Sequence, residues 1–234
     1  MKKIILLFLF LPILLFAQNE TIKLNRFQIG VNFSPDLCYR MLSTQNANDG
    51  FWINIRNKNE GSKFGLTSGL TLYYKLSSRF TIGIGALYSN KGYKIKRSDW
   101  MPPTNSIDYF LPVANSKFRY SYLDIPLIIQ YRILNFSDKF SLSTSLAGTF
   151  NFIISKQLII HDSKNKSANT LNISDFNNIN FSGNISIDFA YQLNSKFKLS
   201  LSPTYRYSFM PIYKSTVKDH LYSIGLNTGL IYQL

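Results

Sequence analysis

A two-residue alternation of apolar and polar side chains, repeated between aromatic marks, is the feature that most constrains how this chain can fold. In one such stretch, Phe80, Ile82 and Ile84 alternate with small or polar neighbours. Successive side chains of a β-strand point to opposite faces, so this period predicts strands with one apolar face. Similar stretches open at four basic–Phe pairs, which are Arg26-Phe27, Arg79-Phe80, Lys139-Phe140 and Lys196-Phe197.

A second mark closes four further stretches with the same alternation. It consists of Tyr, any residue, and then Leu or Ile, and it occurs at 74–76, 131–133, 191–193 and 232–234. Four opened and four closed strands make eight. Short polar links follow the first three closing marks. Long connections follow the opened strands, at roughly residues 37–62, 96–116, 156–177 and 210–219.

Short turns at one rim and long loops at the other are typical of an up-and-down transmembrane barrel, with the turns in the periplasm. A soluble barrel or sandwich also alternates, but with its apolar face inward. Its solvent face usually carries abundant Lys and Glu, whereas the polar positions here are mostly Gly, Ser, Thr and Asn. That composition suits the narrow lumen of eight strands. We therefore predict an all-β fold, an eight-stranded antiparallel up-and-down transmembrane β-barrel.

The aromatic marks predict where the barrel meets the membrane interface. Because Tyr and Phe are enriched where headgroups meet acyl chains, the marks should form a girdle at the periplasmic side. Its members are Phe27, Tyr74, Phe80, Tyr131, Phe140, Tyr191, Phe197 and Tyr232. We expect parts of the opposite girdle from Tyr88, Tyr93, Phe118, Tyr120, Tyr122 and Tyr207.

Two prolines interrupt the predicted strands. Pro126 and Pro203 have no N–H to donate, and a closed barrel has no free edge on which to place them. We expect a β-bulge at each proline, or a site where the ladder is already interrupted.

The first 17 residues have the composition of a secretory signal peptide. Lys2 and Lys3 precede an apolar run over residues 4–16, and Ala17 provides a small residue at the boundary. The run is too short and wrongly flanked for a membrane-spanning helix. We expect residues 1–17 to be the signal peptide, 18–25 an N-terminal tail and 26–234 the outer-membrane β-barrel domain.

The chain is basic. Two of its 26 Lys and Arg residues lie in the predicted signal peptide. The remaining 24, set against 12 Asp and Glu, give the rest of the chain a net charge of +12. A basic exported protein suits an anionic lipid, an anionic glycan or an acidic partner, and a solubilising loop surface would have the same composition. The densest basic stretch holds Lys91, Lys94, Lys96 and Arg97. In a soluble protein it would suggest nucleic acid. At the outer rim of a barrel lipopolysaccharide phosphate is the expected partner rather than nucleic acid. A merely solvated strand end accounts for the same residues and is the simpler interpretation.

The last eight residues, NTGLIYQL, resemble the C-terminal signal by which outer-membrane barrels are handed to the insertion machinery. Asn227 is followed two residues later by Gly229, and Tyr232 and Leu234 then share the outward face. A terminal Phe is the commoner ending, so Leu234 is a mild departure. We expect these residues to close the sheet against the first strand and to bind the barrel-insertion machinery during biogenesis.

A resemblance to a known family rests on two segments, GLTLYYKLSSRFTIGIGALYSNKGYKI and YSYLDIPLIIQYRI. They resemble the outer-membrane β-barrel family that contains the PorT-like proteins, above all in a strand that ends in YSNKGY and the next with YLDIPL. The likeness runs from about Arg26 to Leu234. It implies a barrel in the outer membrane of a Gram-negative bacterium. A few members of the family assist a secretion and gliding apparatus, while most have no assigned activity. The resemblance therefore supports the location more than the role, and an accessory role in secretion or gliding is its more specific version.

Catalytic and metal chemistry find little support in the sequence. A hydrolase at the outer rim needs a nucleophile, a base and an orienting acid, and the only histidines, His161 and His220, fall in predicted long loops. Asp219 precedes His220, but adjacent residues of a strand point to opposite faces. The histidines and the lone Cys38 show no metal-ligand spacing. We expect no catalytic residues, no metal and no cofactor.

Charges on the polar faces provide the candidate functional residues. Alternation directs Lys75, Asp124, Arg132, Asp188, Lys198 and Arg206 into the lumen. An uncompensated charge in so narrow a space is costly, so we expect Asp124 and Asp188 to neutralise Arg132 and Arg206. The network would be either a plug that keeps the barrel rigid or a gated polar path.

The favoured function is a non-enzymatic outer-membrane protein whose basic, aromatic loops contact lipid, glycan or another envelope protein. Components of a secretion or gliding apparatus are the partners that the family resemblance implies. A narrow pore or transporter for small solutes is the alternative, and an envelope hydrolase is a third class. The lumen discriminates between the first two, because eight strands leave little open water. The hydrolase would instead need a cluster of His, Ser and an acid at the rim, within hydrogen-bond reach.

Overall fold

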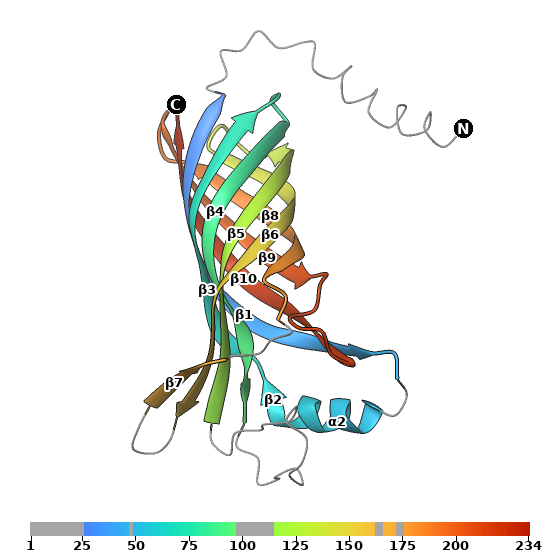
Figure 1. The fold of residues 1–234 in the computed structure, drawn as a ribbon. Helices are drawn as coiled ribbons and strands as arrows, with labels where there is room; N and C mark the ends of the chain where they lie inside the picture. Colours follow the sequence, from blue (N-terminus) through green and yellow to red (C-terminus); the bar gives the residue numbers. More distant parts are fainter. Residues whose placement is uncertain (1–25, 47–48, 97–114, 162–165, 172–175) are drawn as a thin grey trace, which may run out of the picture.

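The computed structural model describes residues 26–46, 49–96, 115–161, 166–171 and 176–234. Its body is a closed antiparallel sheet of eight strands, in the order β1-β3-β4-β5-β6-β8-β9-β10 with β10 returning to β1 (Figure 1). The prediction of an all-β, eight-stranded up-and-down barrel is confirmed. The predicted signal peptide and N-terminal tail lie outside the described residues. The strands of the ring are β1 (Phe27–Thr44), β3 (Lys63–Lys75), β4 (Phe80–Ile95), β5 (Asn115–Asn135), β6 (Phe140–His161), β8 (Ile179–Gln192), β9 (Phe197–Ser208) and β10 (Val217–Gln233).

The ring closes through the residues that the sequence repeats. The main-chain N–H of Leu234 donates to the carbonyl oxygen of Phe27, with 3.0 Å between the two atoms. In the turn between β3 and β4, the N–H of Leu76 donates to the carbonyl oxygen of Phe80 at 2.9 Å, and the turn before β9 repeats this bond. The Tyr-x-Leu mark thus makes the same main-chain contact at a turn and at the seam of the barrel.

The aromatic marks pair across neighbouring strands at the turn end of the barrel. Each Phe that opens a strand lies opposite the Tyr that closes the next strand of the ring. Such tilted ring pairs add packing beyond the area they cover. The contact of this girdle with lipid headgroups stays a prediction. The ring-centroid distances are 5.0 Å for Phe27–Tyr74, 4.9 Å for Phe80–Tyr131, 5.7 Å for Phe140–Tyr191 and 5.2 Å for Phe197–Tyr232.

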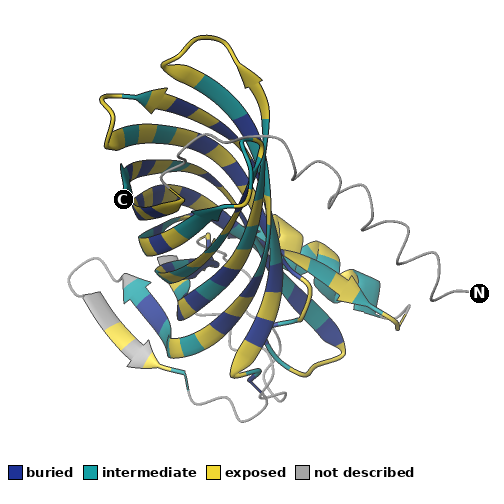
Figure 2. Cartoon of the chain, turned by 90° about the horizontal axis from the view of Figure 1, so that it is seen from above, coloured by how far each residue is buried: buried dark blue, intermediate teal, exposed yellow. Residues whose placement is uncertain are grey.

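The outward face of the ring is apolar and the inward face is polar. Figure 2 shows how exposed and buried residues alternate along the strands. In β1, Phe27, Ile29, Val31 and Phe33 are exposed, while the residues between them are buried. A soluble protein would bury these side chains, so the alternation fits hydrocarbon around the outer face. No helix in the described ranges has the length and apolar character needed to cross a membrane.

The strands continue well beyond the expected loop boundaries. β1 pairs with β10 as far as Thr44 and Val217, and β5 pairs with β6 as far as Asn115 and His161. The loops predicted to begin at residues 37 and 156 therefore begin later, because β1 and β6 stay paired with their neighbouring strands beyond those residues. This outer extension also holds helix α2 (Gly50–Asn59), strand β2 (Glu60–Gly61) paired with β4, and strand β7 (Lys166–Thr170) paired with β6 (Figure 1).

Both prolines lie where a ladder is interrupted without a change of register. The β4–β5 pairs skip from Ile84–Leu127 to Leu87–Asp124, which leaves Pro126 unpaired on that side. The β8–β9 pairs likewise skip over Pro203. The β5–β6 register shifts fall elsewhere in β5. Of the two expectations, the interrupted ladder is found and the bulge is not.

Candidate functional site

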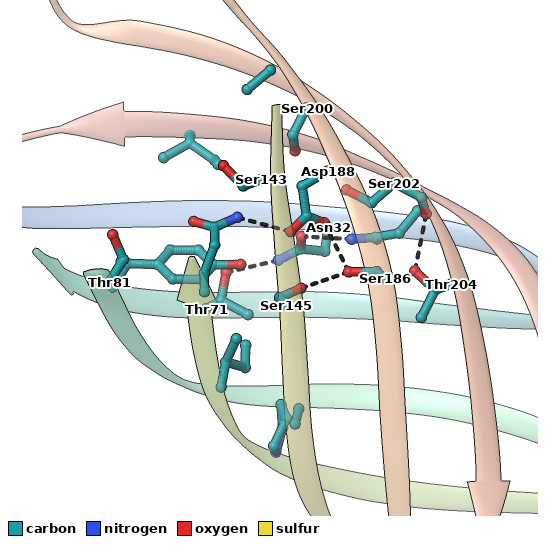
Figure 3. Close-up of a pocket in the computed structure, with 18 of the residues that line it drawn as sticks. Asn32, Thr71, Thr81, Ser143, Ser145, Ser186, Asp188, Ser200, Ser202 and Thr204 are labelled. Atoms are coloured by element: carbon teal, nitrogen blue, oxygen red, sulfur yellow. Dashed lines mark hydrogen bonds between the residues drawn. The ribbon is translucent and has the colours of Figure 1, made fainter. Parts of the chain in front are cut away.

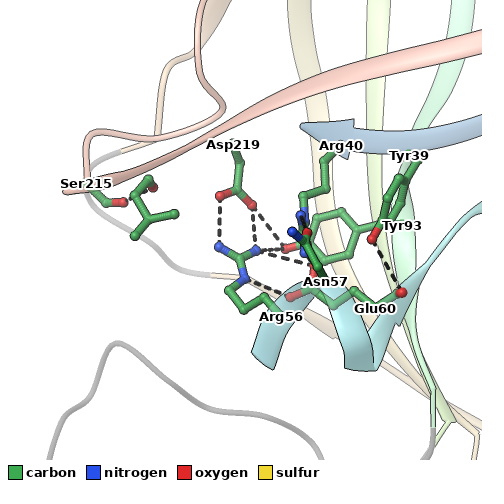
Figure 4. A network of polar contacts seen from close by, with 9 residues as sticks. Tyr39, Arg40, Arg56, Asn57, Glu60, Tyr93, Ser215 and Asp219 are labelled. Carbon is green, nitrogen blue, oxygen red and sulfur yellow. Dashed lines mark hydrogen bonds and ion pairs between the residues drawn. The ribbon is translucent and has the colours of Figure 1, made fainter. Parts of the chain in front are cut away.

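The lumen is the candidate site because the inward faces of all eight strands meet there. Its outer end holds a buried ion-pair network around Glu60, which follows α2 (Figure 4). The Nη2 atom of Arg40 lies 2.6 Å from Glu60 Oε2, and the Nε atom of Arg56 lies 2.7 Å from Glu60 Oε1. Arg56 also binds Asp219, with 2.7 Å between Nη2 and Oδ2. The side chains of Arg40 and Asp219 are fully buried.

Helix α2, which lies between β1 and β2 along the chain, supplies side chains to this network from the outer extension of the barrel. Arg56 and Glu60 are four residues apart, the spacing that brings side chains together on one helix face. The Nη1 atom of Arg40 also donates to the side-chain oxygen of Asn57, with 2.9 Å between Nη1 and Oδ1. Burial opposes the charge of Arg56, but Tyr93, Asp219 and Glu60 outweigh it and raise the pKa of the guanidinium. Residues from α2, β1, β2 and β10 are thus tied into one outer plug, formed by Arg40, Arg56, Glu60 and Asp219.

An apolar layer packs directly against the outer plug. It contains Tyr93 and Tyr120 from the strands, together with Phe176 and Ile212 from the connections that precede β8 and β10. The N–H of Asn177 donates to the carbonyl oxygen of Ile212 at 2.9 Å, so these two connections are joined to each other. Burial raises the pKa of the neighbouring Tyr213 phenol, and the Asp219 carboxylate raises it further.

The prediction that Tyr93, Tyr120 and Tyr122 belong to an outer girdle is wrong. All three are buried inside the barrel. Tyr120 and Tyr122 lie four and two residues before Asp124, and in a strand that spacing places them on the same inward face.

Two further ion pairs cross the middle of the lumen. The Nζ atom of Lys91 lies 2.9 Å from Asp124 Oδ2, and Asn151 donates to the other carboxylate oxygen. The Nη1 atom of Arg206 lies 2.7 Å from Asp36 Oδ1. All four charged side chains are buried or nearly so, and a buried charge is tolerated when it is paired and hydrogen-bonded in this way.

A polar cavity of about 100 Å³ occupies the turn-side half of the lumen (Figure 3). Serine and threonine hydroxyls from β3, β4, β6, β8 and β9 line it, and Asp188 lies among them. The Asp188 carboxylate accepts hydrogen bonds from Gln130 at 2.9 Å and from Ser186 at 2.8 Å. Lys75, Arg132 and Lys198 line the same cavity.

The predicted lumen charges all face inward, but the predicted pairing is wrong. Arg206 pairs with Asp36, and Asp124 pairs with Lys91. Within the described part of the chain, Arg132 forms no ion pair. The alternation identifies the face of the strand on which a side chain lies. Ion pairing also depends on the level along the barrel axis at which each charged side chain lies. Alternation from Phe27 already turns Asp36 and Arg40 inward, but their pairing was not predicted. The same holds for the other paired residues, Arg56, Glu60, Lys91 and Asp219.

The predicted lipid-contact residues separate into two groups. Lys91 cannot contact lipid, because it is buried in the lumen against Asp124 and the Tyr122 ring. Lys94, on the outward face of β4, and Lys96, which directly follows β4, are exposed. Arg97 lies outside the described residues.

A comparison of sequences decides the family. The model of the outer membrane protein beta-barrel domain family matches residues 16–214. The chain belongs to this family. It is therefore an outer-membrane β-barrel protein of the bacterial envelope, in agreement with the closed ring and its apolar outer face. No curated protein matches the chain.

Several solved outer-membrane barrels are similar to this family member in fold. Neisserial surface protein A (NspA) is 14% identical to this chain, with a TM-score of 0.44. The match covers 89% of this chain and 97% of the NspA chain. OprG from Pseudomonas aeruginosa is 14% identical, with 91% and 98% covered and a TM-score of 0.41. AlkL, solved in DMPC lipid bilayers, is 12% identical, with 93% and 94% covered and a TM-score of 0.47.

The C-terminal residues of this outer-membrane barrel form the seam with β1. Asn227 points inward and donates to Asn32 Oδ1 at 3.3 Å, and Gly229 lies opposite Asn32 in the register. Tyr232 packs on Phe197, and Leu234 is exposed on the outside. Recognition of these residues by the insertion machinery stays a prediction.

Within the described ranges, His220 is not part of a catalytic triad. His220 lies in β10 rather than in a loop, and its ring stacks on Tyr207 with 6.0 Å between centroids. Its Nδ1 atom lies 3.1 Å from the carbonyl oxygen of Ser208, while Asp219 points into the lumen. His161 ends β6. The described residues contain no cluster of three His, Cys, Asp or Glu side chains placed to hold a metal ion.

Proposed function

We propose that this protein is a closed, non-enzymatic outer-membrane barrel that acts through its outer surface rather than as a pore. The observation that carries the proposal is the outer plug, in which Arg40, Arg56, Glu60 and Asp219 tie α2 and β2 to β1 and β10. The apolar layer lies against it, so a solute would have to disrupt both. A gated polar path would require buried charges to separate, and each unpaired charge would be strongly destabilising.

Planar-bilayer recording tests this proposal. The wild-type protein should show no resolvable conductance steps. Arg56→Ala removes the side chain that joins Glu60 to Asp219 and should produce openings, whereas Lys58→Ala, on the exposed side of the same helix, should not. A steady conductance from the wild-type protein would favour the pore instead.

The outer surface that we propose for lipid contact lies on β4 and β5. Lys94 and Lys117 are exposed and lie opposite each other in the register, and Lys96 follows on the same face. A tilted strand crosses the hydrocarbon in about 9–11 residues. Counted from Phe80 at the turn-side girdle, Lys94 and Lys96 therefore lie beyond the apolar band. Phosphate groups of the outer leaflet, including those of lipopolysaccharide, are the anions available at that height.

An accessory role in protein secretion or gliding is the more specific version of the proposal. Its support is the resemblance of the segments around YSNKGY and YLDIPL to the PorT-like proteins. Gentle crosslinking in native membranes, followed by purification of the barrel, tests it. Recovery of secretion or gliding components is the expected result, and recovery of the barrel alone would contradict the accessory role.

A further inference from the structure

The positions directly after the aromatic marks form a ring at the turn end of the lumen. Because each mark faces outward, the residue that follows it faces inward, and each of the eight strands contributes one such residue. None of them is exposed. The ring consists of Gln28, Lys75, Thr81, Arg132, Ser141, Gln192, Lys198 and Gln233, and all except Gln192 and Gln233 line the turn-side cavity.

This ring contains three cations and no carboxylate. Lys75 contacts the amide oxygen of Gln233, with 3.2 Å between Nζ and Oε1. Arg132 and Lys198 form no ion pair within the described residues. Lys198 is close enough to Lys75 and Arg132 for their charges to act on it.

Asp188 is the acid among the described cavity-lining residues, and its charge also acts on Lys198. Within the described residues it forms no ion pair with the three cations, so one carboxylate stands against three positive charges. Both carboxylate oxygens of Asp188 accept hydrogen bonds from neutral donors, one from Gln130 and one from Ser186. The carboxylates in the middle of the lumen, Asp36 and Asp124, are paired with Arg206 and Lys91, and those of the outer plug are paired with Arg40 and Arg56. Three cations in so narrow a space repel one another, and a bound anion would relieve that repulsion.

A second observation also points to an acceptor in this cavity. The side chain of Gln28 is 2% exposed and lines the cavity, yet its Nε2 donor has no hydrogen-bond partner among the residues that the structure describes. A buried donor without a partner is destabilising. The surrounding Ser and Thr hydroxyls supply further donors that can rotate toward a ligand.

We propose that the turn-side cavity binds a small oxyanion, such as phosphate, between Lys75, Arg132 and Lys198. Charge-assisted hydrogen bonds from Lys and Arg to such an anion are strong, and the cavity of about 100 Å³ suits a group of that size. The outer plug closes the opposite end of the lumen, so the anion enters from the turn side, which is the periplasm in the orientation expected for these barrels.

Calorimetric titration of the refolded, detergent-solubilised barrel with inorganic phosphate tests the proposal at fixed ionic strength in chloride. One saturable site is expected. Lys198→Met, which removes a cavity cation, should weaken the affinity at least about tenfold, since one charged hydrogen bond is lost. Lys58→Met, on the exposed side of α2, should leave the affinity unchanged. Sulfate should compete with phosphate, and chloride alone should not.

A folding control keeps the result interpretable. Each variant must retain the heat-resistant gel mobility of the folded barrel, and Lys75→Gln is the second choice if Lys198→Met does not fold. The proposal is overturned if wild-type protein gives no saturable phosphate binding. It is equally overturned if folded cavity variants bind phosphate as the wild type does.

Discussion

Arg206 on β9 and Asp36 on β1 form an ion pair across β10, the strand that lies between them. The Nη1 atom of Arg206 is 2.7 Å from Asp36 Oδ1. The pair passes over Gly225, which lies opposite Asp36 in the register and whose missing side chain leaves room for the contact. The barrel wall at this height is therefore tied together by side chains as well as by the main-chain ladder.

Replacing Arg206 by Met should destabilise the barrel. Asp36 would be left buried without its counter-charge, and the loss of one partner of such a pair costs about 3–5 kcal/mol in the free energy of unfolding. Urea unfolding followed by gel mobility measures it. The double variant Arg206→Met/Asp36→Asn should recover part of the loss, because the uncompensated charge is gone. Strictly additive effects of the two substitutions would contradict the pairing.

Gly225→Ala should weaken the same contact from the wall side. An added Cβ would overlap Asp36 Oδ1 and lie 2.6 Å from Ser34 Oγ and 2.8 Å from Arg206 Nη1. We expect a loss of about 1–3 kcal/mol, the usual effect of overpacking. Gly50→Ala in α2 is the matched control, since its Cβ would meet nothing within 4 Å. Equal stability of the two variants would show that the pair does not need Gly225.

The eight-stranded barrel was predictable from sequence because the signals that define each strand lie within that strand. Period-two alternation identifies the faces, and the Phe and Tyr marks identify where each strand begins or ends. The Arg206–Asp36 pair was not predictable, because its members are 170 residues apart. Their contact depends on the relative heights of three strands. Alternation shows that both side chains point inward, but it does not show at which level they meet.

Tyr232 and Tyr131 allow assembly to be separated from stability. Each packs on one Phe across the neighbouring strand, with ring-centroid distances of 5.2 Å and 4.9 Å. Tyr232→Ala and Tyr131→Ala should therefore lower the unfolding free energy by similar amounts. If Tyr232 is also part of an assembly signal, only its variant should slow insertion by native outer-membrane machinery. Equal insertion rates, measured by pulse-labelling and appearance of the heat-resistant form, would argue against the signal.

The outward lysines of β4 should contribute to lipopolysaccharide binding. The double variant Lys94→Gln/Lys96→Gln removes two exposed positive charges from the outer extension and should reduce co-sedimentation with lipopolysaccharide, most clearly at low salt. Lys139→Gln/Lys196→Gln removes the same charge from exposed positions at the turn end and should have no such effect. If the two double variants lose binding equally, net charge rather than location is responsible.

The outer plug was beyond sequence reasoning for a different physical reason. The segment GFWINIRNKN of α2 has no acidic residue in its first turn and no side-chain cap, so few local signals mark it as a helix. Its place is fixed by tertiary contacts of Arg56 with Asp219 and of Glu60 with Arg40. Nothing within α2 specifies those partners.

Reactivity of Cys38 in intact cells tests the central claim, that the outer end of the lumen is closed. Cys38 points into the lumen two residues below Arg40 of the plug, is fully buried, and contacts the carbonyl oxygen of Asn90 through its sulfur at 3.7 Å. A small membrane-impermeant thiol reagent added from outside should leave it unlabelled until the protein is unfolded in urea. Rapid labelling of the native protein would contradict a closed barrel.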